Sequence, residues 1–289
     1  MRAWLVAARP ATLLAAVAPV LVGSGLAAAD DVLRWDAFAA ALAGAVLINL
    51  AANFANDASD AKRGTDTADR IGPPRAVATG LLTARQVWKG AAIVVGMAAV
   101  IGAYLAWISS WLIIAIGVAS ILAMLGYTGG PWPYGYRALG ELFVFIFFGP
   151  VAVVGSRYVH DTTAPLDAWL LAIPVGFLVT AILVANNVRD IDTDRVAGKR
   201  TLAVVLGRTA TRALFSALII GAFVLIAVFA AVGATGTWTL LALLALPLAL
   251  QPIRHVSTKV DGPSLIAALK ANARLHVIVG VLLAVGVQL

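Results

Sequence analysis

Six of the chain's 14 acidic residues fall in two short segments, each of which follows a long apolar run. Clustered carboxylates repel one another and are costly to desolvate, so a cation is expected between them. Hard oxygen ligands suit Mg²⁺, which keeps some waters and bridges carboxylates to phosphate oxygens. The two segments therefore predict a site for Mg²⁺ and a phosphorylated ligand. They read Asn53-Phe-Ala-Asn56-Asp57-Ala-Ser-Asp60-Ala-Lys62-Arg63-Gly64-Thr65-Asp66 and Asn186-Asn187-Val-Arg189-Asp190-Ile-Asp192-Thr-Asp194-Arg195.

The two segments repeat one spacing. An Asn precedes an Asp by four residues in both, and a further acid follows three or four residues later. Such steps keep side chains on one face of a helix, so we expect Asn53, Asp57 and Asp60 on one stripe, and Asn186, Asp190 and Asp194 on another. The alternative is that these are solvated charges that end apolar helices, which the repeat disfavours. The predicted metal ligands are Asp57, Asp60, Asp66, Asp190 and Asp194.

Basic residues are interleaved with both acidic segments. Arg and Lys bind phosphate directly, so they are the partners that a metal-bound diphosphate needs. Basic residues at helix ends also act as anchors at lipid head groups, which is the role we favour for Arg208, Arg212, Arg254 and Lys259. For Arg75 and Lys199 we favour phosphate binding, and we place Lys199 with Asp57, Asp60, Asp190 and Asp194 among the catalytic candidates. The remaining candidates for substrate contact near the acids are Asn53, Asn56, Asn186, Arg189 and Arg200.

A segment rich in Gly, Pro and aromatic residues separates the two acidic clusters, from Tyr127 to Pro150. Gly and Pro allow a backbone to re-enter a helix close to a ligand, and Glu141 is an ionisable group inside an apolar span. Its alternative role is to favour a helix N-terminus electrostatically. We predict that Tyr127 and Glu141 contact a second substrate.

The composition indicates where these residues reside. Of 289 residues, 62% are hydrophobic and only 12% are charged, and the mean hydropathy is +0.96, which indicates an integral membrane protein. The net charge of +7 could suggest nucleic acid, but the basic residues lie between long apolar runs, so no nucleic-acid partner is expected. The absence of Cys excludes disulfides, thiol catalysis and zinc held by Cys.

Nine apolar stretches are long enough to cross the bilayer as helices, which predicts an all-α polytopic bundle. Two longer runs are divided at Ser109/Ser110 and at Gly233 to Thr237, where small and polar residues interrupt them. The loops are short, so residues 1–289 are expected to form a single membrane domain. The predicted spans are Ala11 to Ala29, Ala37 to Ala55, Trp88 to Trp107, Trp111 to Thr128, Ala138 to Ser156, Ala168 to Val188, Ala213 to Val232, Trp238 to Ile253 and Asn272 to Leu289.

The distribution of basic residues predicts the orientation. With the N-terminus inside, the inner segments hold 19 of the 21 Lys and Arg residues, leaving Arg34 and Arg157 outside. This asymmetry is typical of a cytoplasmic face. We therefore expect a multi-pass protein of the cell membrane with a cytoplasmic N-terminus. Both acidic segments then end helices that run toward the cytoplasm, so the site is expected to open on that side.

These motifs resemble the UbiA-type superfamily of intramembrane aromatic prenyltransferases over almost the whole chain, from Arg9-Pro10-Ala-Thr12-Leu13 onward. The likeness is greatest to the branch that prenylates 1,4-dihydroxy-2-naphthoate in menaquinone biosynthesis, through Gly64-Thr65-Asp66, Tyr127 to Pro131, Gly140-Glu141-Leu142 and Asp190 to Leu202. The superfamily often carries a third acid in its first motif, four residues after the second. That position is Gly64 here, so Asp66 ranks below the other four predicted ligands.

The resemblance implies a reaction. A polyprenyl diphosphate would bind through Mg²⁺, ionise to an allylic cation and alkylate the naphthoate ring, releasing diphosphate and CO₂ and giving demethylmenaquinone. Two alternatives stay open. One is a UbiA-type enzyme with another aromatic or lipid acceptor. The other is a secondary transporter, which is disfavoured because its coupling acids usually lie near mid-membrane rather than at helix ends.

Overall fold

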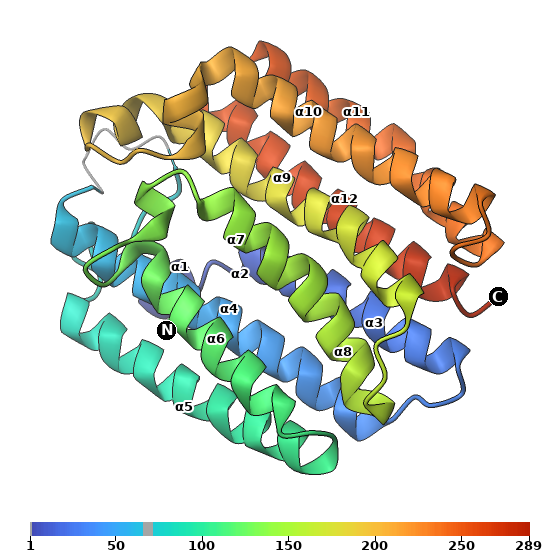
Figure 1. The fold of residues 1–289 in the computed structure, drawn as a ribbon. Coiled ribbons are helices and arrows are strands. Elements are labelled where there is room, and N and C mark those ends of the chain that lie inside the picture. Colours follow the sequence, from blue (N-terminus) through green and yellow to red (C-terminus); the bar gives the residue numbers. More distant parts are fainter. Residues whose placement is uncertain (1, 66–71) are drawn as a thin grey trace.

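The computed structural model describes residues 2–65 and 72–289, and it is helical along most of that length. Within this part of the chain, eight helices are long and apolar enough to cross a membrane, and Leu112–Thr128 is a further apolar helix of 17 residues. The long helices lie side by side along one direction (Figure 1). The elements are α1 (Arg2–Ala8), α2 (Pro10–Leu13), η1 (Leu14–Ala16), α3 (Val17–Ala29), α4 (Trp35–Arg63), α5 (Ala84–Ile108), α6 (Leu112–Thr128), η2 (Tyr134–Tyr136), α7 (Gly140–Ile146), η3 (Phe147–Val151), α8 (Ala152–Asp161), α9 (Leu166–Val196), α10 (Leu202–Ala231), η4 (Thr237–Ala245), α11 (Leu246–Thr258) and α12 (Gly262–Gly286).

Each predicted span corresponds to a helical segment, and the two predicted breaks are confirmed between α5 and α6 and between α10 and η4. The start of the last span was predicted ten residues too late, because α12 begins at Gly262 rather than Asn272. Asp261 caps this helix by accepting a hydrogen bond from the Ser264 amide at 2.9 Å, and Pro263 lies in its first turn. These residues favour a helix start, but polar side chains in the first turns mask it in a hydropathy profile.

The N-terminal helical segment Arg2–Ala29 begins before the predicted span and is broken at Arg9, whose φ of 49° separates α1 from α2. Two amides of α4 hold this break: Asn49 Nδ2 donates to the Thr12 carbonyl at 2.9 Å, and Asn53 Nδ2 donates to the Ala8 carbonyl at 2.9 Å. Left-handed backbone at a non-glycine residue costs free energy and persists only where its surroundings enforce it. Helix α4 therefore determines the path of the chain around Arg9.

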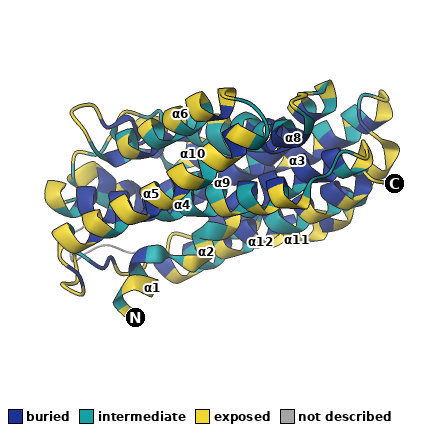
Figure 2. Ribbon diagram, turned by 90° about the horizontal axis from the view of Figure 1, so that it is seen from below, coloured by how far each residue is buried: buried dark blue, intermediate teal, exposed yellow. Residues whose placement is uncertain are grey.

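Buried apolar side chains form four clusters in the described part of the chain, two of which are large. Helix α9 runs through the larger of these two, whose buried core includes Leu171, Leu178, Phe215 and Leu275; α4 and α5 share the other around Phe54. Buried residues lie between the helices, and exposed residues cover their outward faces (Figure 2). Small residues allow the close contact of α3 with α12, because a Cβ at Gly280 would lie 2.9 Å from Ala18 Cα.

All eight Trp side chains of the chain are exposed, and all lie close to helix ends. Trp is enriched where membrane helices reach the water interface. The Trp side chains form two sets, which mark the two interfacial levels of an integral membrane protein. The first set lies toward the end where α4 and α9 finish, and the second lies toward the opposite end. The first set is Trp4, Trp88 and Trp132, and the second is Trp35, Trp107, Trp111, Trp169 and Trp238.

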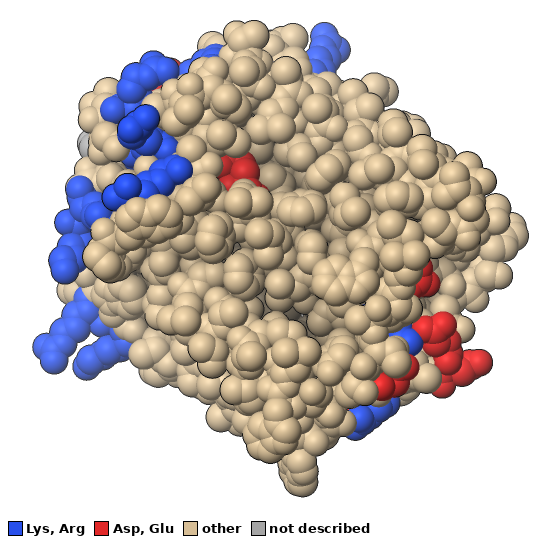
Figure 3. Space-filling view, in the orientation of Figure 1, with Lys and Arg blue, Asp and Glu red and all other residues tan. Residues whose placement is uncertain are grey.

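The charges divide between the same two ends. Lys and Arg side chains gather where α4 and α9 end, at the left in Figure 3, whereas acidic side chains gather at the opposite end. At that opposite end, buried Arg157 pairs with Asp30 at 2.6 Å and with Asp161 at 2.6 Å. The asymmetry expected from the sequence is thus a property of the folded molecule.

Candidate active site

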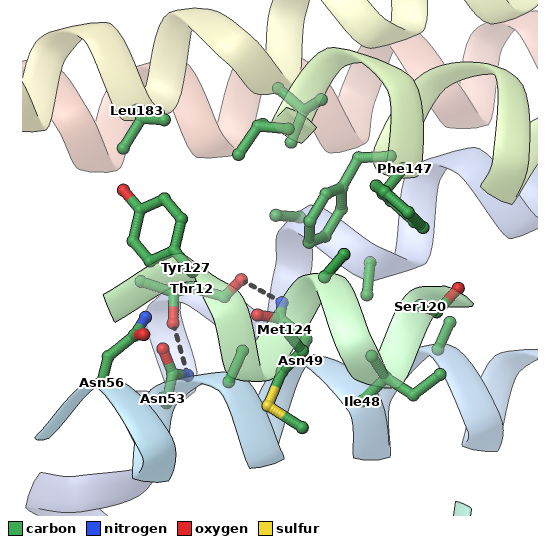
Figure 4. Close-up of a pocket in the computed structure, with 18 of the residues that line it drawn as sticks. Thr12, Ile48, Asn49, Asn53, Asn56, Ser120, Met124, Tyr127, Phe147 and Leu183 are labelled. Carbon is green, nitrogen blue, oxygen red and sulfur yellow. Dashed lines mark hydrogen bonds between the residues drawn. The ribbon is translucent and has the colours of Figure 1, made fainter. Parts of the chain in front are cut away.

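A cavity of about 820 Å³ brings residues of the two acidic segments together. One end is polar, and the rest is apolar and extends past Leu105, Ile113 and Val159, which lie on the far ends of their helices. Figure 4 shows Asn49, Asn53 and Asn56 on α4 facing Tyr127 and, beyond it, Leu183. The polar end is lined by Asn53, Asn56 and Asp60 of α4, Arg75, Lys199, and Asn186, Asn187, Arg189, Asp190, Thr193 and Asp194 of α9.

Each acid in this polar end has a cationic neighbour. Arg75 Nη2 lies 3.2 Å from Asp60 Oδ2, and Lys199 Nζ lies 3.9 Å from Asp194 Oδ1. Asp190 accepts from its chain neighbour Arg189, at 2.7 Å from Nε and 2.6 Å from Nη2. Carboxylates and cations therefore alternate around one cavity, an arrangement that can bind both a metal ion and the oxygens of a diphosphate.

Tyr136, which was not among the predicted site residues, contacts both Asp60 and Lys199. Its hydroxyl donates to Asp60 Oδ1 at 2.8 Å, and Lys199 Nζ lies 5.1 Å from the centre of its ring. Burial, together with the Asp60 charge, raises the pKa of Tyr136, so its hydroxyl remains a donor. Its position in the Gly- and Pro-rich loop between the two acidic segments was the available signal.

Asp57 does not occupy the place predicted for it. Its side chain is fully buried and is absent from the cavity lining. Its Oδ2 accepts from the Ala76 amide at 3.0 Å, and its Oδ1 accepts from the Val77 amide at 3.2 Å. A carboxylate whose two oxygens already bind backbone amides is poorly placed to coordinate a metal. The regular stripe expected for α4 therefore supplies Asp60, but not Asp57, to the cavity.

Asn53 and Arg200 make contacts other than those predicted for them. Asn53 lines the cavity, but its amide group donates to the Ala8 carbonyl and to Thr12 Oγ1. Arg200 is exposed and outside the cavity lining, because its backbone pairs with that of Arg137 at the surface. The prediction for Asp66 falls outside the described residues.

The remaining predicted residues lie on or beside the cavity wall. Asn56 Oδ1 accepts from the Thr128 hydroxyl at 2.9 Å, and Asn186 Oδ1 accepts from Arg189 at 2.6 Å. Glu141 is buried next to the lining residue Asn187, whose amide donates to it. These contacts tie α4 to α6 and α9 to α7.

A row of aromatic rings borders the polar end. The Tyr127 and Tyr134 rings meet edge to face at 5.4 Å between centroids. Tyr134 stacks on Phe143 at 4.0 Å, and Phe143 lies 6.2 Å from Phe147. All four side chains line the cavity. Ring faces attract a cation and also exclude water.

The carboxylates that line the polar end suit a Mg²⁺ ion that is bound partly by the protein and partly by phosphate. Among residues 2–65 and 72–289, no three acidic or His side chains are close enough to form a single metal cluster. Mg²⁺ commonly binds proteins through one or two carboxylates, with phosphate oxygens and waters completing its shell. Asp60 on one helix, and Asp190 and Asp194 on another, match that pattern.

Comparison with known proteins identifies the family of the chain. Residues 16–276 match the model of the UbiA prenyltransferase family. A 1,4-dihydroxy-2-naphthoate octaprenyltransferase of Mycobacterium tuberculosis is 43% identical over 267 residues, which cover 92% of this chain and 90% of the relative.

Two solved structures share the fold. A UbiA homolog from Aeropyrum pernix K1 aligns with a TM-score of 0.71 at 18% identity, over 94% of this chain and 97% of that one. A UbiA homolog from Archaeoglobus fulgidus, bound to GPP and Mg²⁺, aligns with a TM-score of 0.67 at 14% identity, over 98% and 99%. The chain belongs to the UbiA prenyltransferase family.

Proposed function

We propose that this protein transfers a polyprenyl group from an allylic polyprenyl diphosphate to 1,4-dihydroxy-2-naphthoate. One observation carries the proposal: a single cavity joins a polar end, with alternating acids and cations, to an apolar interior. A polyprenyl diphosphate has the same two parts, an anionic head and a long apolar tail. The dihydroxynaphthoate acceptor is supported by the 43% identity to a protein named for that acceptor.

Mg²⁺ is the proposed cofactor, and Asp60, Asp190 and Asp194 are the residues that would hold it. When bound, it supplies positive charge beside the departing diphosphate. Arg75 and Lys199 supply fixed positive charge at the same end of the cavity and bind phosphate oxygens directly. The acids hold both cations close by in the structure, so little reorganisation is needed when a diphosphate enters.

The protein's contribution to bond making is to shape and dry the cavity. The C–O bond to the diphosphate breaks with both electrons on oxygen, and the allylic carbon becomes positive. Ring faces of Tyr127, Tyr134 and Phe143 stabilise that carbon and keep water away from it. The ring carbon that bears the carboxylate then attacks, the bond to the carboxylate breaks, and its electrons return to the ring as CO₂ leaves. The product is demethylmenaquinone in its reduced, quinol form.

The direct test is a reconstituted reaction with purified protein, farnesyl diphosphate, dihydroxynaphthoate labelled in its carboxyl group, and Mg²⁺. We expect a prenylated naphthol with release of labelled CO₂, and loss of both when a chelator removes the metal. Turnover only with another aromatic acceptor would retain prenyl transfer and overturn the acceptor assignment. Absence of diphosphate release with any acceptor would overturn the proposed function.

We further propose that the protein lies in the cell membrane with its N-terminus and the acidic end of the cavity toward the cytoplasm. The clustering of Lys and Arg at that end supports this orientation (Figure 3). The chain has no Cys, so single-cysteine variants give a clear readout. In intact cells, an impermeant maleimide should label Ala164→Cys at the opposite end and should leave Ser257→Cys unlabelled until the cells are opened. The reverse pattern would invert the topology.

A further inference from the structure

Among the described acids of the first motif, Asp57 is the one that does not line the cavity. It is one helical turn before Asp60 on α4, yet its carboxylate is fully buried and binds the amides of Ala76 and Val77. We propose that Asp57 is a positioning residue: it fastens the turn that carries Arg75, and thereby holds the Arg75 guanidinium where it binds the diphosphate. This inference rests on the proposed function, since it concerns the same diphosphate site.

The turn in question is short and anchored at both ends. The Arg75 carbonyl accepts from the Thr79 amide at 3.0 Å and from the Thr79 hydroxyl at 2.6 Å. The Leu82 amide donates to the Ala76 carbonyl at 3.1 Å, and Ala76 is completely buried in the core region that α4 and α5 share. The first amides of such a turn have no partner within it, and the Asp57 carboxylate supplies one.

Asp57 and Asp60 therefore bind different parts of one segment: Asp57 binds its backbone, and Asp60 binds one of its side chains. Residues three apart on a helix face the same neighbour. Here that neighbour is the turn from Arg75 to Gly80: Asp57 binds its backbone, and Asp60 lies 3.2 Å from the Arg75 guanidinium. A diphosphate that draws Arg75 away from Asp60 would leave the backbone contact at Asp57 in place.

The geometry also separates this role from metal binding. Two backbone amides bind the two Asp57 oxygens, and hydrogen bonds to a charged acceptor are the strong kind. Coordination of Mg²⁺ by Asp57 would require both bonds to break. Loss of the carboxylate should instead release the turn, so that Arg75 samples positions in which it does not meet a diphosphate.

Calorimetry on the full-length protein in detergent tests the proposal without an acceptor substrate. Inorganic diphosphate is titrated at saturating Mg²⁺, and Mg²⁺ is titrated at saturating diphosphate. The variants are Asp57→Ala, Asp57→Asn, Arg75→Ala and the double variant Asp57→Ala/Arg75→Ala, with Asp60→Asn as the comparison for a metal ligand. Thermal unfolding of each variant reports whether it is folded.

We expect Asp57→Ala and Arg75→Ala each to weaken diphosphate binding by about tenfold or more, the scale of a lost charge-assisted contact. The double variant should be no weaker than Arg75→Ala, because both changes remove one contribution. The Mg²⁺ requirement should stay unchanged in the Asp57 variants and rise in Asp60→Asn. Asp57→Asn keeps one acceptor oxygen, so it should lose less affinity than Asp57→Ala, and it serves if the Ala variant does not fold.

Two results would overturn the positioning role: a Mg²⁺ shift in an Asp57 variant as large as that of Asp60→Asn, or losses that multiply in the double variant. Unaltered diphosphate binding by the Asp57 variants would also overturn it. If the unsubstituted protein itself binds no diphosphate with Mg²⁺, the proposed function fails, and this result is distinct from the other three.

Discussion

The side-chain amide of Asn187 donates a hydrogen bond to Oε1 of Glu141 at 2.8 Å, which joins α9 to α7 beside the cavity. The other Glu141 oxygen, Oε2, is buried with no hydrogen-bond partner among the described residues. Replacing Glu141 by Ala leaves the Asn187 amide without its acceptor. We expect a loss of about 1–3 kcal/mol in the free energy of unfolding, the cost of an unsatisfied buried polar group.

The matched control is Glu141→Gln, which keeps an oxygen that can accept from Asn187. Thermal unfolding in detergent should place the Gln variant much closer to the unsubstituted protein than the Ala variant. Equal losses for Gln and Ala would show that the negative charge, rather than the hydrogen bond, stabilises this contact. If Glu141 also contacts the acceptor, as we predict, the Gln variant raises the KM for dihydroxynaphthoate and leaves that for the prenyl diphosphate unchanged.

Substitution of an acid that lines the cavity should reduce activity far more than substitution of a nearby acid that does not. Asp190→Asn and Asp60→Asn are expected to lower kcat/KM on the order of a hundredfold, the scale of removing one group that stabilises charge in a transition state. Both should also raise the Mg²⁺ concentration for half-maximal rate. Asp192→Asn is the control, because the Asp192 side chain is 67% exposed and pairs with Arg208 at 2.7 Å. An equal loss in the Asp192 variant would contradict the assignment of the site.

Lys199 and Arg195, both close to the end of α9, offer a second comparison. Lys199 Nζ lies near Asp194 and above the Tyr136 ring, so Lys199→Met should raise the KM for prenyl diphosphate by about tenfold or more through loss of a phosphate contact. Arg195→Met removes a charge of the same sign from a side chain that is 59% exposed. Steady-state kinetics should show little change in the Arg195 variant. Similar effects of both substitutions would indicate a general loss of positive potential rather than a direct contact.

The apolar part of the cavity predicts how tail length is accommodated. Gly155 on α8 lines the cavity, and a Cβ at this residue would meet open space. A Leu there should obstruct long isoprenoid tails, so Gly155→Leu should lower kcat/KM for long prenyl diphosphates more than for geranyl diphosphate.

Gly96 on α5 provides the matched control for this substitution. A Cβ at Gly96 also meets open space, but the residue is exposed and outside the cavity lining. Gly96→Leu should therefore leave the ratio of the two kcat/KM values unaltered. A Gly155→Leu variant that loses activity equally on long and short substrates would contradict the path assigned to the tail.

The nine predicted spans and the two breaks within the longest apolar runs could be predicted because each depends on a local property, the length of an apolar run. The α9 side of the site could be predicted from another local property, helical spacing. Asn186, Asp190 and Asp194 lie on one stripe of a regular helix, and all three line the cavity. Helical spacing alone was sufficient to place these side chains together.

The α4 side shows the limit of that reasoning. Asp57 and Asp60 are equivalent by spacing, but they meet different groups of the turn from Arg75 to Gly80. Backbone amides of this turn bind Asp57, whereas the Arg75 guanidinium binds Asp60. The Asn53 side-chain amide likewise donates to the Ala8 carbonyl, at the break next to Arg9. Which partner reaches a side chain is decided by segments distant in sequence, so spacing on α4 could not distinguish a cavity acid from an acid that anchors a loop.

The cations at the polar end of the cavity also bear on what happens after the reaction. In the proposed reaction both substrates are anions, one through its diphosphate and the other through its carboxylate. The prenylated ring has lost the carboxylate as CO₂ and never carried the diphosphate, so it holds no group that these cations attract. We therefore expect the neutral product to leave before the diphosphate, and inorganic diphosphate, rather than the quinol, to inhibit the enzyme.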